Sequence, residues 1–311
     1  MEFSTKVKIA QAGFNISHRH KILMMGSCFT ENVGQYLKQY RFQTILNPFG
    51  IIYNPLSLFN NLERIAEGRY YEEDELLYYN ELYLSLDHHG SFSDTGKSTA
   101  LENINREFEQ AAAHFKDTEW ILITPGTAFV YNYLALDRIA ANCHKIPAKE
   151  FEKRLLTIDE IMDAFNAIRE KLGNKKILFT VSPVRHWRDG AVENQRSKSI
   201  LIESIHRIIE KNDHCFYFPA YEIMMDELRD YRFYSEDMLH PNELAVKYIW
   251  ERFGETYFSA ETQVINQKIE KINLLRQHRV KHVNTKEATA FKEHLDKTKE
   301  EFRREFPWMV L

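Results

Sequence analysis

The chain has 311 residues, a hydrophobic content of 44% and a formal net charge of −4 at pH 7. This much apolar material is enough for a large folded core and excludes wholesale disorder. The charge gives no bulk electrostatic reason to expect a nucleic acid or an anionic membrane as partner, and the 3 cysteines are too few for a disulfide framework.

The beginning of the chain shows no targeting signal. The segment MEFSTKVKIAQAG (1–13) lacks the apolar stretch and the small-residue cleavage site of a signal peptide. The sequence contains no run of about 18 apolar residues, so we expect no transmembrane helix. We therefore expect a soluble, cytoplasmic protein.

Four short apolar runs predict buried strands, and segments with helical periodicity separate them. The runs are HKILMMG (20–26), WILITPG (120–126), KKILFTVSP (175–183) and HCFYFPAYEI (214–223). The helical segments are 56–66, 98–115, 157–172 and 197–211. The third of these opens with Thr157 and has Glu160 three residues later, the pattern of a capping box.

The alternation of strands and helices predicts a three-layer α/β/α sandwich with a mainly parallel sheet. In such sheets, ligands bind beyond the carboxyl ends of the strands. Residues 262–307 are strongly charged and predict one or two amphipathic helices. We divide the chain into a domain (1–258) and a helical extension (259–311) that packs on or near it, with a homo-oligomerisation arm or a lid as alternatives.

A serine stands where the first predicted strand gives way to a helix-like segment. Ser27 follows Gly26, and at such a junction its backbone N–H and the helix dipole are available to a developing oxyanion. Far along the chain, Asp237 and His240 stand three residues apart before Pro241. The carboxylate is expected to orient the imidazole, whose other nitrogen would deprotonate the serine. Combining the two stretches favours this interpretation over a serine that only caps the helix.

These stretches resemble the SGNH hydrolases (GDSL-like esterases and lipases). They are still more similar to the GSCFA-domain family, named for a Gly-Ser-Cys-Phe-Ala stretch that here reads GSCFT (26–30). Other similar stretches are NPFGIIYNP (47–55), TPGTAFVY (124–131), NCHKIP (142–147) and SPVRHWRDGAVENQRSKSIL (182–201). The resemblance covers residues 20–255 and implies an SGNH-type, flavodoxin-like fold.

The resemblance also implies roles for individual residues. Ser27 matches the nucleophile, and Asp237 and His240 match its partners in the triad. The backbone N–H groups of Ser27 and Gly50 match two oxyanion donors, and a glycine suits this task because its backbone can approach an acyl oxygen closely.

The chain departs from the SGNH pattern at a third oxyanion donor. Where those enzymes use an asparagine amide, this chain reads TPGTA (124–128). The hydroxyl of Thr127 is the expected substitute, with Arg185 or His186 as alternatives. Losing one donor without replacement costs roughly 2–4 kcal/mol of transition-state stabilisation.

The resemblance predicts a serine esterase that needs no cofactor or metal. The expected substrate is a small ester, such as an O-acetyl or other O-acyl group on a carbohydrate or a related alcohol, and neither a nucleic acid nor a membrane is an expected partner. An acyltransferase with the same triad, and a non-catalytic domain that binds a ligand or a protein, remain open.

Several other side chains are candidates for the site. Cys28 is a second possible nucleophile, although cysteines are usually buried and it lacks an evident base. Arg185 and His186 follow a predicted strand and are expected to contact substrate, as are His89 and His144 in loops. The histidines and cysteines lack the close Cys-x₂₋₄-Cys spacing of structural zinc sites.

Overall fold

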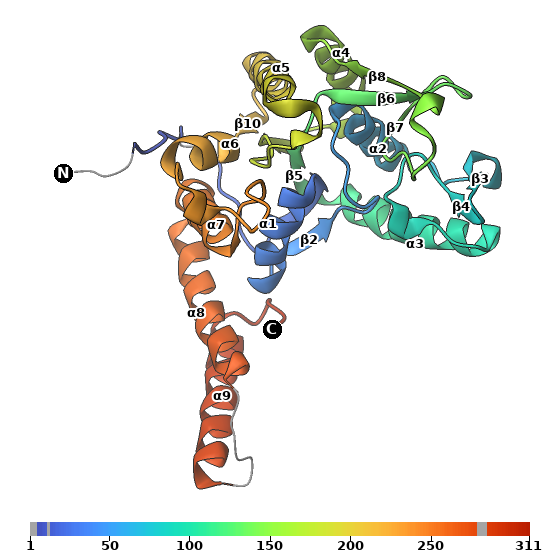
Figure 1. Ribbon diagram of the computed structural model, residues 1–311. Helices are drawn as coiled ribbons and strands as arrows, with labels where there is room; N and C mark the ends of the chain where they lie inside the picture. Colours follow the sequence, from blue (N-terminus) through green and yellow to red (C-terminus); the bar gives the residue numbers. More distant parts are fainter. Residues whose placement is uncertain (1–4, 11–12, 279–284) are drawn as a thin grey trace.

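The computed structural model describes residues 5–10, 13–278 and 285–311. A parallel sheet lies at its centre (Figure 1). Its five strands follow the order β10-β9-β5-β1-β2. The strands are β1 (Lys21–Gly26), β2 (Gln43–Leu46), β5 (Thr118–Thr124), β9 (Lys176–Phe179) and β10 (Cys215–Tyr217). Three of them lie within the predicted apolar runs, and β5 begins two residues before its run. β2 was not predicted because it is a short edge strand with a partly polar sequence.

Alternate residues along the strands enter two separate cores. Leu23 and Met25 of β1 lie in one cluster of buried residues, and Ile22 and Met24 lie in the other. Successive side chains of a strand point to opposite faces of the sheet. A sheet that is covered on both faces therefore needs continuous apolar strands, which is why the short apolar runs identified them.

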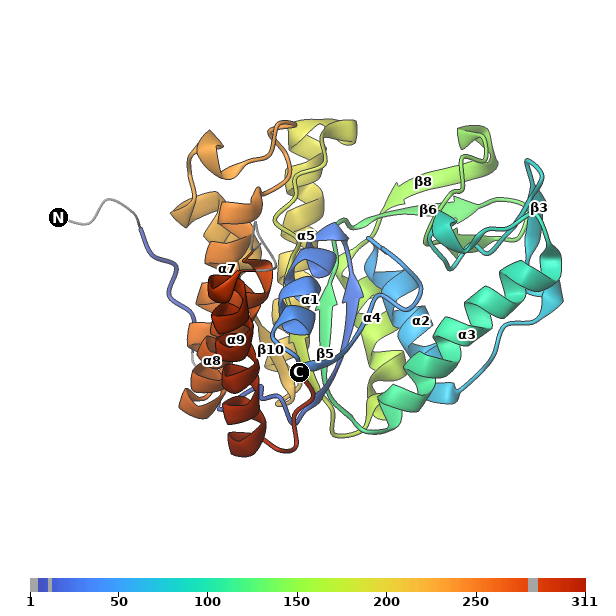
Figure 2. The same cartoon turned by 90° about the horizontal axis from the view of Figure 1, so that it is seen from below.

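Helices cover both faces of the sheet (Figure 2). One face packs against α2 (Pro55–Glu67), α3 (Lys97–Lys116), α4 (Ile158–Arg169) and α5 (Gly190–Glu210). The other packs against α1 (Cys28–Gln39), α7 (Glu243–Tyr257), α8 (Ala260–Gln277) and the end of α9 (Lys286–Glu305). The predicted three-layer α/β/α sandwich is confirmed.

The helix boundaries agree with the sequence patterns to within a few residues, except that α5 begins at Gly190, seven residues before the expected start at 197. The capping box at α4 is formed. The Thr157 hydroxyl accepts a hydrogen bond from the Glu160 N–H at 3.2 Å, and the Glu160 carboxylate accepts one from the Thr157 N–H at 2.8 Å.

The chain also forms two small antiparallel sheets, one between α2 and α3 and one between β5 and α4. Neither sheet was predicted. β3 (Leu77–Tyr79) and β4 (Leu82–Leu84) form a hairpin. β6 (Phe129–Tyr133), β7 (Arg138–Ala140) and β8 (Phe151–Leu155) form a sheet in the order β7-β6-β8. Their residues are mostly half-buried, so their sequences carry neither a continuous apolar run nor a strict alternation.

The C-terminal segment forms two helices, α8 and α9, which extend beyond the sheet (Figure 1). Ile265, Ile269 and Ile272 of α8 are buried in the core that α1 and α7 share. None of the helices in the described part of the chain has the length and apolar character that a membrane span requires.

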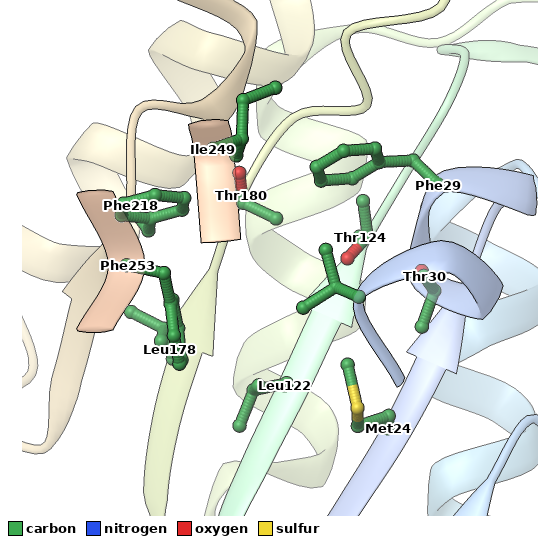
Figure 3. Close-up of a pocket in the computed structure, with 11 residues that line it drawn as sticks. Met24, Phe29, Thr30, Leu122, Thr124, Leu178, Thr180, Phe218, Ile249 and Phe253 are labelled. Atoms are coloured by element: carbon green, nitrogen blue, oxygen red, sulfur yellow. The ribbon is translucent and has the colours of Figure 1, made fainter. Parts of the chain in front are cut away.

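A small cavity of about 20 Å³ lies between the sheet and α1 and α7. Figure 3 shows its mainly apolar walls, among them Met24, Leu122 and Leu178 of the sheet and Phe29 of α1. The space is close to that of one water-sized probe, so the core here is tightly packed.

The packing around Leu122, which is 5% exposed, leads to a prediction for stability. The substitution Leu122→Ala should lower the free energy of unfolding by roughly 2–5 kcal/mol, because it removes buried methyl groups and enlarges the cavity. The matched control Leu244→Ala, at a side chain that is 59% exposed, should change it by less than about 0.5 kcal/mol. Urea unfolding followed by circular dichroism measures both, and equal losses would contradict this description of the core.

Candidate active site

Ser27 lies at the junction of β1 and α1 and is the N-cap residue of that helix. Its side chain is fully buried. Gly26 precedes it with a φ of +156°, and a Cβ on Gly26 would collide with the Thr124 carbonyl oxygen and the Thr30 hydroxyl. Only glycine fits this close approach of the end of β1 to Thr124 and Thr30. The helix begins directly after it, with Ser27 as N-cap.

Asp237 and His240 form a hydrogen-bonded pair in the loop before α7. The His240 Nδ1 lies 2.5 Å from the Asp237 Oδ2, and the other carboxylate oxygen accepts the backbone N–H groups of Leu239 and His240, each at 2.9 Å. These hydrogen bonds, first those from the backbone and then that from the imidazole, lower the pKa of Asp237 to about 2. The carboxylate is ionised at neutral pH and holds one imidazole nitrogen, as an orienting group must.

A series of contacts links this pair to the serine. A Cβ placed on Gly126 would lie 3.5 Å from the Ser27 Cβ and 3.0 Å from Cδ1 of Tyr53. The Tyr53 ring meets the His186 ring edge-on with centroids 5.4 Å apart, and His186 meets His240 at 6.0 Å. The rings of Tyr53 and His186 therefore lie between Ser27, at the end of β1, and the imidazole of His240.

The direct hydrogen bond between Ser27 and His240 is not formed. Among the described residues, the buried Ser27 Oγ has no hydrogen-bond partner. The side chain of His240 is 40% exposed, whereas Ser27 is 0% exposed. In this conformation the serine lies beneath the surface on which the base stands, so proton transfer between them requires one of the two to move.

The two backbone N–H groups expected to bind an oxyanion already donate hydrogen bonds to backbone carbonyls. The Ser27 N–H donates to the Thr124 carbonyl at 3.0 Å, and the Gly50 N–H donates to the Asn47 carbonyl at 2.7 Å. Gly50 has a φ of +76°, and a Cβ there would collide with His89. The structure thus does not present either group as a free donor, and their role in oxyanion binding stays a prediction that requires these bonds to open.

The Thr127 hydroxyl is also engaged. It accepts a hydrogen bond from the Phe129 N–H at 3.0 Å and lies 3.0 Å from the Ser197 hydroxyl. These contacts hold the start of β6 against α5. Thr127 therefore stabilises the turn after β5, and its use as a substitute for the missing asparagine remains a prediction.

Cys28 is the first residue of α1 and is only partly buried. Burial raises the pKa of its thiol, against the opposing effects of the N–H groups of Phe29 and of Cys28 itself and of the nearby Lys198. The thiol thus remains largely protonated at neutral pH, which makes it a weak nucleophile, yet it is more accessible than the serine beside it.

Lys198 is a functional candidate that the sequence analysis missed. It is fully buried, and its ammonium donates hydrogen bonds to the Gly126 carbonyl at 2.8 Å and the Ser182 carbonyl at 2.7 Å. Burial lowers its pKa to about 7, and the charge of Arg185 acts in the same direction. The spacing of Lys198, Leu201 and Ile205, which all lie on the buried face of α5, is the signal that could have revealed it.

A cleft of about 600 Å³ opens beside the series of rings. Tyr53, Thr127 and His186 line one part of it, and His144 lines another. The His144 Nε2 lies 2.8 Å from the Ser85 carbonyl oxygen, which orients its ring. His144 and His186 thus line one cavity, and their contact with substrate stays a prediction.

The other two side chains predicted to contact substrate lie elsewhere. Arg185 lines a separate hollow of about 160 Å³ beside Met238 and Leu239 of the His240 loop. His89 does not line the cleft; its Nδ1 lies 3.0 Å from the Ser91 hydroxyl and accepts the Ser91 N–H. Arg185 and His186 diverge because consecutive side chains in an extended segment point in opposite directions.

Within residues 5–10, 13–278 and 285–311, no three His, Cys, Asp or Glu side chains are grouped so that they could hold a metal ion. A comparison with protein-family models finds that the model of the GSCFA family matches residues 21–253. The chain belongs to the GSCFA family. No curated protein matches the sequence.

The region shared with the GSCFA family has clear structural limits. It begins at the first residue of β1 and ends within α7. It contains all five strands of the parallel sheet, Ser27, Lys198 and the Asp237–His240 pair, whereas α8 and α9 lie outside it. The GSCFA match thus covers the candidate site but not the C-terminal helices.

The lowered pKa of Lys198 predicts a pH dependence of stability. Between the folded pKa of about 7 and the ordinary value of 10.5, the unfolded lysine binds more protons than the folded one, so this group makes the free energy of unfolding rise with pH. The variant Lys198→Met should lose that contribution. Urea unfolding at several values between pH 7 and pH 10 measures the slope. Lys211→Met, at the exposed end of the same helix, should keep the wild-type slope, and an unchanged slope in Lys198→Met would contradict the assignment.

Proposed function

We propose that the protein is a serine esterase that hydrolyses a small ester through an acyl-Ser27 intermediate. The substrate class is an O-acyl group, such as O-acetyl, on a carbohydrate or a related alcohol. The observation that supports this most is the Asp237–His240 pair, in which an ionised carboxylate 2.5 Å away holds one imidazole nitrogen and leaves the other to act as a base.

The proposed reaction has two stages. The Ser27 oxygen attacks the ester carbonyl while the His240 Nε2 takes the hydroxyl proton, and this proton then passes to the departing alcohol. In the second stage, water gives a proton to His240 and attacks the acyl-Ser27 ester. His240 then passes this proton to the departing Ser27 oxygen, and the carboxylic acid is released. The charge of the imidazolium that forms is balanced by Asp237 throughout.

Substrate binding must bring the serine and the histidine together. The loop of residues 234–242 that carries the pair is anchored at its base by the pairing of Tyr234 with Pro241 and by a hydrogen bond from the Ser235 N–H to the His240 carbonyl at 2.8 Å. Its tip is exposed, with Met238 at 53%. Catalytic hydrogen bonds are often long before substrate binds, and we propose that this tip moves towards the end of β1 when the cleft is filled.

Two alternatives differ in chemistry. An acyltransferase would use the same triad and pass the acyl group to a second alcohol instead of water. A non-catalytic domain would only bind a ligand or partner, in keeping with the engaged N–H groups of Ser27 and Gly50. Cys28 is a second candidate nucleophile for either enzyme, because it is more accessible than Ser27.

The location and the partners expected from the sequence are part of this proposal. The protein would act in the cytoplasm on a small molecule, without a nucleic acid or a membrane as partner. The α8 and α9 helices, which lie outside the family match, are the candidate surface for a homo-oligomer.

Covalent labelling separates the two nucleophiles. A fluorophosphonate probe should label the wild-type protein and Cys28→Ala, but not Ser27→Ala, because it reacts with an activated serine hydroxyl. In-gel fluorescence and mass spectrometry of the labelled peptide give the readout. Labelling that persists in Ser27→Ala and disappears in Cys28→Ala would assign the nucleophile to Cys28, and no labelling of any form would favour the non-catalytic domain.

The orienting role of Asp237 is tested by changing the carboxylate to an amide. Asp237→Asn should lower kcat on p-nitrophenyl acetate by about 10³–10⁴-fold, because the amide no longer fixes the imidazole tautomer. Asp230→Asn in the same loop region is the matched control and should retain activity, since the Asp230 side chain, among the described residues, bonds to Arg232 alone. Addition of candidate alcohols during the assay shows whether acyl groups are diverted from water, as an acyltransferase requires.

A further inference from the structure

The cleft beside Tyr53 and His186 is much larger than an acetyl group needs. Its volume of about 600 Å³ lies in the size range of pockets for whole small molecules. The proposed ester bond would lie at the end next to His186. Most of the cleft would therefore be filled by the rest of the ligand.

The walls of this cleft are largely aromatic and apolar. Phe129 and Tyr131 of β6, Ala140 of β7 and Phe151 of β8 line it together with Ile146. Aromatic rings supply a flat contact surface that favours stacked or edge-on packing with a planar group. The unpredicted sheet of β6, β7 and β8 thus forms a surface for a flat, weakly polar body.

Positive charge stands at the rim of the cleft. Arg188 and Lys145 line it, both are exposed, and within the described residues neither has an ion-pair partner. The acidic lining residue, Asp189, is paired with Lys153. The two free cations are therefore not neutralised by the cleft itself.

Lys145 is held at this rim by a strained turn. His144 and Lys145 have φ values of +49° and +60°, a left-handed conformation that is unfavourable for residues other than glycine. The turn is fastened by hydrogen bonds from the Ile146 N–H to the Cys143 carbonyl at 2.9 Å and from the His144 N–H to the Asn142 side chain at 2.8 Å. This turn keeps the lysine and the ring of His144 on the same cleft.

We propose that this cleft binds the substrate through a planar, weakly polar body that carries an anionic group, with Arg188 and Lys145 holding the anion. A carboxylate, a sulfonate and a phosphate monoester share the chemistry that a guanidinium and an ammonium recognise. The inference rests on the proposed function for the position of the ester, but the binding site itself does not require catalysis.

Equilibrium binding tests the site without turnover. The ligands are a hydroxynaphthalenesulfonate, with the hydroxyl and the sulfonate at opposite ends of the ring system, and the naphthol that lacks the sulfonate. Isothermal titration calorimetry in low salt should show the sulfonate binding at least about tenfold more tightly to the wild-type protein and to Ser27→Ala. Added salt should reduce the preference, because both cations are exposed.

Variants locate the two parts of the site. The double variant Lys145→Ala/Arg188→Ala should bind both ligands equally, whereas Lys149→Ala, an exposed lysine of the same region that is paired with Glu150, should keep the preference. Tyr131→Ala should weaken both ligands, since it shortens the aromatic wall. Equal affinity of the two ligands for the wild-type protein, a preference that survives the double substitution, or no binding of either ligand would each overturn the inference.

The acetyl esters of the hydroxynaphthalenesulfonate and of the naphthol are two test substrates. Their hydrolysis separates this inference from the proposed function. If the sulfonate binds with the expected preference but its acetyl ester is not cleaved, the anion site stands and the esterase does not. If both esters are cleaved with equal kcat/KM and the sulfonate shows no binding preference, the esterase stands and the anion site does not.

Discussion

The ammonium of Lys198 connects the parts of the molecule on which the candidate site depends. It donates to the carbonyl of Gly126, just after β5, and to that of Ser182, after β9, and it does so from α5 in full burial. Placing an amine there is costly, because a buried charge loses its hydration. The lowered pKa reflects this cost, and a neutral amine can still donate both hydrogen bonds. The ends of two strands are thereby held to one helix at the edge where ligands bind.

The candidate catalytic groups differ in their exposure to solvent. Ser27, Gly126 and Lys198 are buried, and the N–H groups of Ser27 and Gly126 donate to the distant carbonyls of Thr124 and Tyr53. The Asp237–His240 pair lies on an exposed loop with its internal hydrogen bonds complete. A buried nucleophile and a separately organised base would allow the site to assemble only around a ligand, which is a common way to exclude water from reactive intermediates.

The cleft is built by elements that are additions to the parallel sheet. β6, β7 and β8 leave the carboxyl end of β5 and return to α4, and their aromatic side chains form one wall. The turn that carries Lys145 and the segment that carries Arg188 form the rim. The proposed reacting groups and the surface that would choose the substrate thus come from different parts of the fold, so that one can vary while the other is kept.

The family match sets a boundary between these parts and the C-terminal helices. It ends within α7, although the isoleucines of α8 complete the core on one face of the sheet. The helices outside the match are therefore structurally part of the domain at their base. The division of the chain at residue 258 consequently does not coincide with a break in packing.

The sequence by itself determined the features that depend on local or strongly periodic signals. Strands buried on both faces must be apolar throughout, so β1, β5, β9 and β10 were recognisable, and the Thr157–Glu160 capping box and the Asp237–His240 pair needed only residues three apart. Only the tertiary structure decided that the Ser27 and Gly50 N–H groups are engaged, that Lys198 bridges two strand ends, and that β6 to β8 form a cleft wall. Each of these depends on groups that are far apart along the chain, and no short stretch of residues records which distant carbonyl or ring will lie beside it.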